Sequence, residues 1–172
     1  MLIKDIALFA KIDPNSDAKI PTKREEDGAY DIYASFPEEY IIIEPFSCRL
    51  IPTGIASAFS NEYVAILRER GSTGIKNAKL NAGVIDSGYR DQWFIMIYNA
   101  NEKPLVIAKQ SPQFKDTITY NESEVILYPY SKAIAQFLFV PVPKVKIKEI
   151  TYSELLKFES ERMLGKLGSS NK

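Results

Sequence analysis

The sequence predicts an all-β domain, either a sandwich or a barrel built from many short strands. Apolar runs rich in β-branched and aromatic residues recur along the chain, and Pro, Gly, Asn and Ser separate them. Helical periodicity is weak before residue 151. Short strands with turn residues between them are typical of sandwiches and barrels, so we expect one of these two architectures.

The expected strands follow one another along most of the chain. In order, they are the runs at 6–12, 30–36, 40–46, 48–59, 63–69, 94–100, 104–109, 124–129 and 133–142. After them, the segment TYSELLKFESERML at 151–164 predicts a short turn or helix that opens on Thr or Ser. Its apolar residues are Leu155, Leu156 and Phe158.

The length of 172 residues fits a single domain that buries a substantial core. We expect this β domain to cover residues 1–160. The stretch 109–124 is polar and rich in turn residues, which predicts a long hairpin insertion rather than a second domain. Residues 161–172 are small, polar and glycine-bearing, so we expect a mobile C-terminal motif there.

The charge balance argues against large anionic partners. Lys plus Arg number 22, as do Asp plus Glu, so no overall field favours a nucleic acid or an acidic membrane surface. No apolar run approaches the length of roughly 20 residues that a bilayer-spanning helix needs. We therefore expect no nucleic-acid and no membrane partner, and any anionic ligand should be small and bound by a local cluster.

The numbers of cysteines and histidines limit the possible chemistry of the protein and its cellular compartment. Cys48 is the only cysteine, so the chain forms no internal disulfide, and its first ten residues lack the apolar core of a signal peptide. This predicts a reduced, cytoplasmic protein. Histidine is absent, which removes the usual general base and the commonest transition-metal ligand. If the protein is an enzyme, a carboxylate performs the proton transfer.

The segment NAGVIDSGYRDQWF at 81–94 places an acid, a tyrosine and an arginine within five residues at a turn. The pattern predicts a hairpin with Ser87 and Gly88 at its tip. On local pattern alone, the favoured interpretation is structural: Asp86 caps the turn, Tyr89 packs on the sheet and Arg90 is solvated. A carboxylate at a rigid turn could instead hold a water molecule for catalysis.

Five short sequence motifs, which follow one another along the chain, favour a functional interpretation of this turn instead. They are DGAYDIYA (27–34), RERGSTG (68–74), NAGVIDSGYR (81–90), AIAQFLF (133–139) and RMLGKLGSS (162–170). With these motifs the chain resembles the trimeric dUTP nucleotidohydrolase (dUTPase) family, of the phage or bacterial type. The resemblance implies a jelly-roll-like β fold and a homotrimer with sites at subunit boundaries. It also implies Mg²⁺-dependent cleavage of dUTP to dUMP and pyrophosphate, in the host cytoplasm if a phage encodes the chain.

The resemblance implies a catalytic set of three residues. Asp86 would activate the water that attacks the α-phosphate in line, and Gln136 would reach toward the phosphates and that water. Asp31 would help to hold Mg²⁺ through water, because this ion keeps several waters and is bound mainly by substrate phosphates.

The resemblance also implies the substrate contacts. Tyr89 would lie under the deoxyribose and exclude a 2′-hydroxyl by its shape. The phosphates would be bound by Arg70, Gly71, Ser72 and Thr73, and the uracil would be bound largely by main chain around Asn81, Gly83 and Ile85. The C-terminal motif would close over the substrate through Arg162, Leu167, Gly168, Ser169 and Ser170.

Several positions depart from the family pattern. Gly71 separates Arg70 from Ser72, where the family commonly has Arg-Ser-Gly, and Gly28-Ala29 reverses the usual Ala-Gly. Ala133 stands where an arginine is frequent. Leu167 replaces the aromatic residue that would stack on uracil, so apolar cover is kept and stacking is lost.

Two alternatives remain open at this point. One is a dCTP deaminase-like enzyme of the same fold, whose chemistry requires a glutamate beside cytosine, whereas this hairpin offers Asp86 and Tyr89. The other is a regulatory binding protein in which nucleotide occupancy controls a protein partner. The insertion at 109–124 motivates this second alternative, because partner contacts are frequent on added surface loops.

Overall fold

The computed structural model describes residues 5–109 and 122–160 of the chain. Most of the expected insertion and the C-terminal motif, with Arg162, Leu167, Gly168, Ser169 and Ser170, lie outside these residues. The chain divides into two compact units, residues 1–142 and 143–172. The expected domain of residues 1–160 stays a prediction. Within the described part of the chain, no helix is long and apolar enough to cross a membrane.

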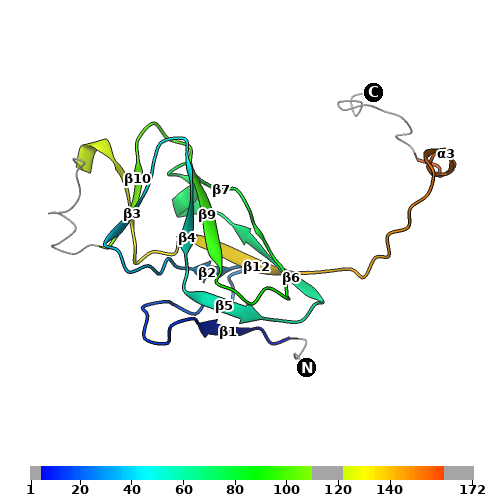
Figure 1. Cartoon of the computed structure of the whole chain (residues 1–172), viewed down its shortest axis with the longest axis horizontal. Coiled ribbons are helices and arrows are strands. Elements are labelled where there is room, and N and C mark those ends of the chain that lie inside the picture. The colour runs from blue at the N-terminus through cyan, green and yellow to red at the C-terminus, as the bar shows by residue number, and fades with distance from the viewer. Residues whose placement is uncertain (1–4, 110–121, 161–172) are drawn as a thin grey trace. The chain divides into compact units, whose positions relative to one another are not determined.

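The first unit consists of short strands, as the sequence predicts (Figure 1). The strands are β1 (Leu8–Lys11), β2 (Tyr30–Ile32), β3 (Tyr40–Ile43), β4 (Cys48–Pro52), β5 (Ile55–Ala58), β6 (Tyr63–Arg68), β7 (Ala78–Leu80), β8 (Val84–Ile85), β9 (Phe94–Asn99), β10 (Leu105–Ala108), β11 (Ile126–Pro129) and β12 (Ala135–Pro141). The described residues of this unit also form a helical turn, α1 (Gly71–Gly74), and a 3₁₀ turn, η1 (Glu122–Glu124). The all-β prediction is confirmed.

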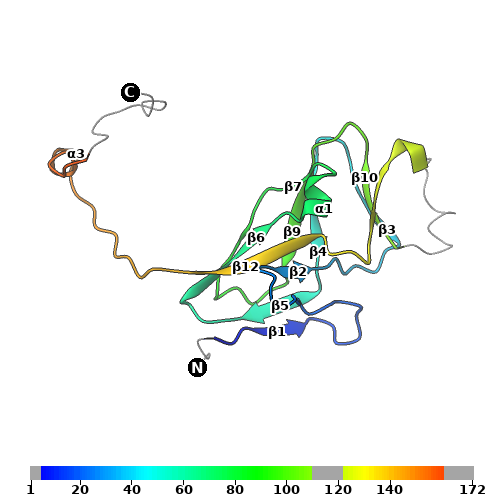
Figure 2. The same ribbon diagram turned by 180° about the vertical axis from the view of Figure 1, so that it is seen from behind.

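The strands form four sheets. Their orders are β1-β5, β11-β10-β3, β2-β12-β6-β8 and β4-β9-β7. Figure 2 shows β12, β2 and β6 from behind, with α1 following β6. Because β12 is central and pairs with both β2 and β6, residues that are distant in sequence lie side by side on this sheet.

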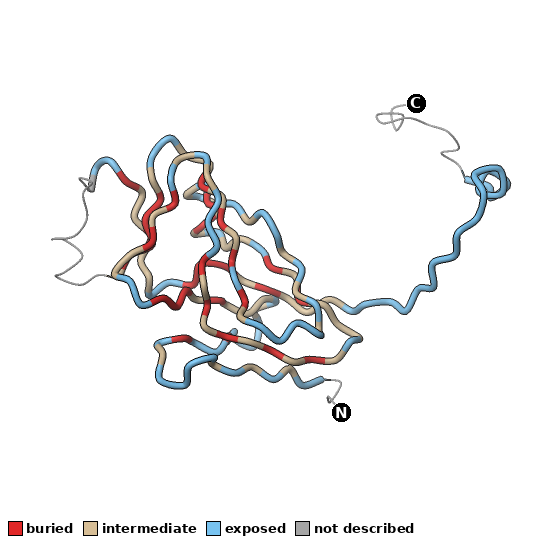
Figure 3. Tube along the Cα trace, in the orientation of Figure 1, coloured by how far each residue is buried: buried red, intermediate tan, exposed pale blue. Residues whose placement is uncertain are grey.

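Buried residues recur along the strands of this unit and form its core (Figure 3). Phe137 on β12 is fully buried, and its ring centroid lies 5.2 Å from that of Trp93 and 5.3 Å from that of Tyr30. The indole N–H of Trp93 donates to the Ser57 hydroxyl (3.1 Å), so this large side chain is buried with its polar group satisfied.

The long run expected at 48–59 is two strands, β4 and β5, rather than one. Gly54 separates them with a φ of 67°, a left-handed conformation that favours glycine. A Cβ atom at this position would lie 2.8 Å from the Cβ of Ala18 and 3.0 Å from the Ser35 hydroxyl. The chain therefore turns a tight corner here, and β5 pairs with β1 instead of extending β4.

The segment 81–94 forms the predicted turn but not the predicted pair of strands. The Tyr89 amide donates to the Asp86 carbonyl (3.1 Å), so Ser87 and Gly88 are at the tip as expected. However, β8 pairs with β6, and β9 pairs with β4 and β7. The two arms of the segment thus lie in different sheets, and the hairpin prediction is wrong in its pairing.

The strands on either side of the insertion run parallel. Leu105 pairs with Ile126 and Ala108 pairs with Pro129. Parallel neighbours need a crossover, so the connection between β10 and β11 is not the loop of a hairpin formed by these two strands. Residues 110–121 of that connection lie outside the described residues.

The second unit contains the helix that the sequence predicts. The helix α3 (Tyr152–Leu155) begins after Thr151, whose hydroxyl accepts a hydrogen bond from the Glu154 amide (3.2 Å). The Glu154 carboxylate accepts in turn from the Thr151 amide (2.8 Å), which completes a capping box.

Candidate active site

Asp31, Gln136 and Arg68 lie opposite one another on β2, β12 and β6. Residues that are paired directly across an antiparallel ladder project from the same face of the sheet. Arg70 lies two residues beyond Arg68, and its guanidinium forms a two-point ion pair with Asp31, with Nε–Oδ1 2.8 Å and Nη2–Oδ2 3.2 Å. Asp31 and Arg70 are both partly exposed.

Gln136 is held by the main chain of the neighbouring strand end. Its side-chain amide Nε2 donates to the Glu69 carbonyl (2.8 Å). The amide oxygen and the second N–H of this side chain can still form hydrogen bonds to a ligand or a water. Glu69 is the residue between Arg68 and Arg70, so Gln136 and Arg70 are fixed relative to each other through one peptide.

The turn that follows Arg70 is built by its own side chains. The Thr73 hydroxyl accepts from the Arg70 amide and donates to the Arg70 carbonyl, both at 3.0 Å, and Thr73 is buried. The Ser72 hydroxyl lies 3.0 Å from the Tyr128 hydroxyl, which itself donates to the Ala133 carbonyl (2.6 Å). Since a tyrosine has one hydroxyl proton, Ser72 donates in this arrangement. A phosphate contact through the Ser72 proton would require this hydroxyl to rotate.

Asp31, Arg70 and Gln136 line one open, largely polar cavity of about 700 Å³. Lys23 and Arg24 line it as well, and sequence analysis did not select them. Lys23 donates to the carbonyls of Arg24, Glu25 and Asp27 at 2.9–3.3 Å. The signal that could have identified them is the adjacent pair of cations just before the first motif. The three cationic side chains of the lining outnumber its two carboxylates, so the cavity suits a small anion.

Arg24 is neutralised by a local ion pair with Asp27 (Nε–Oδ2 2.9 Å). The hydrogen bond from the Arg24 side chain lowers the pKa of the Asp27 carboxyl below its usual value. Asp27 therefore stays ionised together with its partner.

The residues expected to contact a base lie at β8, the edge strand of this sheet, and at the end of β7 in a different sheet. The main chain of Gly83 approaches β6 closely: its carbonyl accepts from the Leu67 amide (2.7 Å), and a Cβ would lie 3.0 Å from the Leu67 carbonyl oxygen. Ile85 pairs with Ala65 on the same strand. Asn81 follows β7, and its side-chain amide donates to the Cys48 sulfur (3.0 Å).

Asp86 occupies the first position of the turn at 86–89 and is exposed. Its carboxylate makes no hydrogen bond or ion pair with another described residue. Tyr89 is 39% exposed, and its hydroxyl donates to the Gln92 carbonyl (2.9 Å), which fixes the ring at the surface. Arg90 donates to the carbonyls of Ser87 (2.6 Å) and Ser57 (3.3 Å), so it ties this turn to β5.

The structure thus brings together part of the expected site. Asp31, Arg70 and Gln136 line one cavity, while Asp86 and Tyr89 do not line it. Within the described ranges, no three His, Cys, Asp or Glu side chains gather as a metal site. The single chain therefore presents two separate groups of expected site residues.

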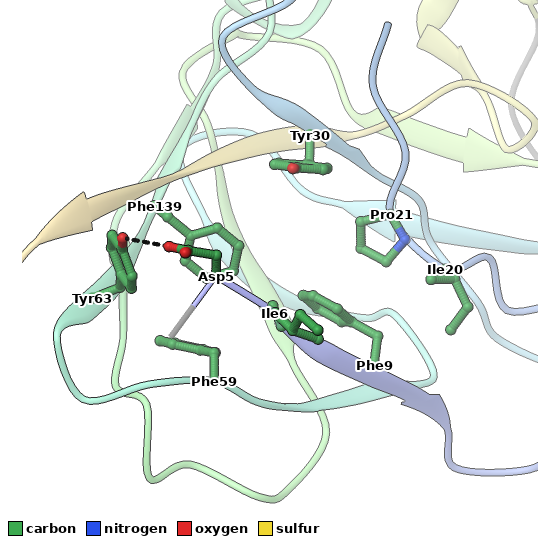
Figure 4. A pocket seen from close by; sticks show the side chains of 10 residues that line it. Asp5, Ile6, Phe9, Ile20, Pro21, Tyr30, Phe59, Tyr63 and Phe139 are labelled. Atoms are coloured by element: carbon green, nitrogen blue, oxygen red, sulfur yellow. Dashed lines mark hydrogen bonds between the residues drawn. The ribbon is translucent and has the colours of Figure 1, made fainter. Parts of the chain in front are cut away.

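A second cavity, of about 560 Å³, has a different set of lining residues (Figure 4). Aromatic side chains dominate its lining, among them Phe9, Phe59, Tyr63 and Phe139. The Tyr63 hydroxyl donates to the Asp5 carboxylate at 3.5 Å. None of the site residues expected from the sequence lines this cavity.

Comparisons with known proteins identify related sequences. Residues 16–111 match the family model described as dUTPase. A deoxyuridine 5'-triphosphate nucleotidohydrolase of Clostridium tetani is 30% identical over 160 residues, which are 91% of this chain and 91% of that protein. A Pol polyprotein of caprine arthritis encephalitis virus is 32% identical over 111 residues, 64% of this chain, but the chain spans only 10% of that polyprotein.

A solved structure shares the fold. The dUTPase of Staphylococcus bacteriophage 80alpha with dUPNHPP superposes with a TM-score of 0.74 at 23% identity. The match covers 98% of this chain and 100% of the phage chain. The jelly-roll-like β fold that the resemblance implied is therefore confirmed.

Proposed function

Because the chain belongs to the dUTPase family, we propose that it hydrolyses dUTP to dUMP and pyrophosphate at a site built from Asp31, Arg70, Gln136 and Asp86. The observation that carries the assignment of residues is the cavity in which Asp31, Arg70 and Gln136 meet. These residues come from three motifs that lie far apart in the sequence. They can bind one ligand together only if the fold brings them to one cavity, as it does.

The phosphates occupy this cavity in our proposal. Arg70 supplies charge to the triphosphate, and Gly71 and Ser72 allow close approach of main-chain and hydroxyl groups. Thr73 contributes by holding the turn, because its hydroxyl already bonds to both main-chain groups of Arg70. Gln136 is held by the bond from one of its two amide N–H groups to Glu69, and its amide oxygen orients the attacking water.

Asp31 fits the role of holding Mg²⁺ through water. Both of its oxygens already accept from Arg70, and each keeps a lone pair that can accept from a metal-bound water. One outer carboxylate suffices for an ion bound mainly by substrate phosphates. When bound, Mg²⁺ relieves negative charge on the triphosphate.

Asp86 is the proposed base. Its carboxylate takes a proton from the attacking water as the oxygen bonds to the α-phosphorus and pyrophosphate leaves. Tyr89 packs under the deoxyribose and leaves no room for a 2′-hydroxyl. Asn81, Gly83 and Ile85 surround the uracil, whose edge is matched by main-chain groups, so cytosine would leave polar groups unpaired.

A homotrimer with sites at subunit boundaries unites the two groups of residues. In one chain, the cavity with Asp31 and the turn with Asp86 are separate. A neighbouring copy would bring its Asp86 and Tyr89 to this cavity. Arg162, Leu167, Gly168, Ser169 and Ser170 would close over the nucleotide. We expect the reaction to take place in the cytoplasm, which remains a prediction.

One assay tests the function. Pyrophosphate release is measured from dUTP with and without Mg²⁺ and compared with release from dTTP, dCTP and UTP, while ammonia release is scored with dCTP. We expect Mg²⁺-dependent pyrophosphate from dUTP alone. Ammonia from dCTP would favour the deaminase alternative, and no pyrophosphate from any nucleotide would refute hydrolysis.

A regulatory role beside catalysis is a second candidate. The phage 80alpha protein is described as one that controls transfer of virulence genes by a proto-oncogenic G protein-like mechanism. In the present chain, the insertion at 109–124 would supply the partner surface. Replacing them with a Gly/Ser linker of equal length should preserve hydrolysis and abolish capture of a partner from host extract. A partner retained by this variant would exclude the insertion as its surface.

A further inference from the structure

The turn at 86–89 is not held by packing. Asp86, Gly88 and Tyr89 are exposed, and a Cβ atom at Gly88 would meet no heavy atom within 4 Å. One main-chain hydrogen bond, from the Tyr89 amide to the Asp86 carbonyl (3.1 Å), closes the turn. An exposed turn with few contacts opens easily unless other bonds hold it. The position of the Asp86 carboxylate therefore depends on side chains that bind this turn.

Arg90 supplies such bonds. Its guanidinium nitrogen Nη1 donates to the carbonyls of Ser87 (2.6 Å) and Tyr89 (3.3 Å) in the turn, and to the Ser57 carbonyl (3.3 Å) on β5. Ser57 is buried, and its hydroxyl accepts from the Trp93 indole, so this part of β5 is fixed in the core. Hydrogen bonds from a charged donor are stronger than neutral ones. One side chain thus fastens the exposed turn to a buried strand.

The rest of the loop is anchored independently of Arg90. The side-chain oxygen of Gln92 accepts from the Gly54 amide (3.0 Å), and the Trp93 amide donates to a carbonyl of β5 (2.9 Å). The Tyr89 hydroxyl donates to the Gln92 carbonyl (2.9 Å), which holds the ring from the far side of the turn. Loss of Arg90 should therefore leave the domain folded and free only the part of the turn that follows β8.

We propose that Arg90 is a positioning residue that holds the turn against β5, so that the Asp86 carboxylate meets the attacking water. This inference deepens the proposed function and rests on it. All of these bonds lie within one chain, so each copy presents its Asp86 in the same position to the cavity of its neighbour. Arg90 acts through the turn and not on the substrate. Its loss should lower kcat rather than raise KM.

The test compares two substitutions at this position with a matched control. Arg90→Ala should lower kcat for dUTP by about 100-fold, because a displacement of about 1 Å in a catalytic group suffices for such a loss, and KM should stay within about threefold. Arg90→Lys keeps the charge but not the planar donor group, so we expect a fall of about tenfold.

The control is Arg49→Ala. The Arg49 guanidinium also donates to a main-chain carbonyl, that of Ile42 (2.9 Å), but it joins β4 to β3. Its kcat should stay within about twofold of wild type. An unchanged kcat in Arg90→Ala would overturn the inference. A rise in KM as large as the fall in kcat would also overturn it, since Arg90 would then bind the substrate directly.

Amide hydrogen exchange tests the positioning without relying on activity. The Tyr89 amide, which closes the turn, should exchange at least about tenfold faster in Arg90→Ala than in wild type, whereas the Trp93 amide should keep its rate. Equal Tyr89 exchange in both proteins would overturn the inference. If Arg90→Ala does not fold, the same measurements are made on Arg90→Lys. If wild type releases no pyrophosphate from dUTP, the proposed function fails, and the exchange rates still decide whether Arg90 holds the turn.

Discussion

Asp31 and Arg70 contact each other through two nitrogen–oxygen pairs, at 2.8 and 3.2 Å, although 39 residues separate them in the sequence. The pair joins β2 to the end of β6. Its side chains are 29% and 30% exposed, and an ion pair this accessible to solvent contributes little to folding stability. We interpret its main effect as keeping Arg70 aimed into the cavity.

Asp31→Asn should therefore lower activity more than stability. We expect kcat/KM for dUTP to fall by at least about tenfold and the free energy of unfolding to change by less than about 1 kcal/mol. Steady-state kinetics and urea denaturation measure the two quantities. Asp13→Asn is the control, since Asp13 is exposed and its carboxylate accepts from the nearby Asn15 amide. A loss of stability equal to the loss of activity would contradict this interpretation.

Asp86→Asn should cut kcat by about 100-fold or more while nucleotide binding persists, because it removes a base and not a phosphate ligand. Turnover of dUTP and calorimetric binding of a non-hydrolysable analogue are measured on the same preparation. The control is Asp91→Asn in the same loop, whose carboxylate accepts from the Gln92 amide. Wild-type turnover in Asp86→Asn would remove Asp86 from the mechanism.

Tyr89→Ala should admit ribonucleotides. With the ring gone, the 2′-hydroxyl has room, so the ratio of kcat/KM for dUTP to that for UTP should fall by about tenfold or more. Tyr89→Phe loses only the hydrogen bond to the Gln92 carbonyl and should keep the discrimination. Equal discrimination in Tyr89→Ala and wild type would show that another group excludes the ribose.

Gly83→Ala should destabilise the protein. The added Cβ would lie 3.0 Å from the Leu67 carbonyl oxygen, which belongs to paired main chain and cannot move away easily. We expect a loss of about 1–2 kcal/mol in the free energy of unfolding, together with weaker dUTP binding. Gly88→Ala is a matched control for stability, since nothing lies within 4 Å of its Cβ position. Equal stability of both variants would show that β6 and β8 can separate at no cost.

Tyr130 and Asp17 predict a stability loss at high pH. The Tyr130 hydroxyl donates to Asp17 (2.6 Å), and burial together with this bond raises the pKa of Tyr130 to about 12 from its ordinary value of 10.0. A raised pKa gives stability that is complete below pH 10 and is lost as pH rises through about 12. Tyr130→Phe should remove this slope between pH 10 and 12 and cost about 1 kcal/mol at neutral pH.

Thermal and urea unfolding at several pH values measure this effect. Tyr152→Phe provides the control, because Tyr152 is 66% exposed on α3. An unchanged slope in Tyr130→Phe would assign the alkaline loss of stability to other groups.

The strands were predictable because their residues carry a local signal. β-branched and aromatic runs indicate where strands lie, and Thr151 with Glu154 indicates where α3 begins. Pairing was less predictable. Val84 and Ile85 form a strand of two residues whose partner, β6, lies far back in the chain, and the pattern at 81–94 favoured the nearer partner.

The site was predictable only in part, because it also depends on how distant strands pair. Motif resemblance identified Asp31, Arg70 and Gln136, but their convergence depends on the register of β2, β12 and β6. Glu69 and Arg90 were overlooked because their roles are bonds to main-chain groups, which leave no periodic trace in a sequence. The local pattern predicts a solvated Arg90, and Glu69 is only the last residue of the expected strand at 63–69.

The parallel pairing of β10 with β11 limits how the loop between them can be engineered. Because the two strands point the same way, any replacement has to travel back along their four-residue overlap, roughly 13 Å, before it enters β11. A two-residue turn could not close that path without pulling a strand out of the sheet. Shortened or grafted versions of this region therefore have a minimum length, set by topology and independent of what the loop recognises.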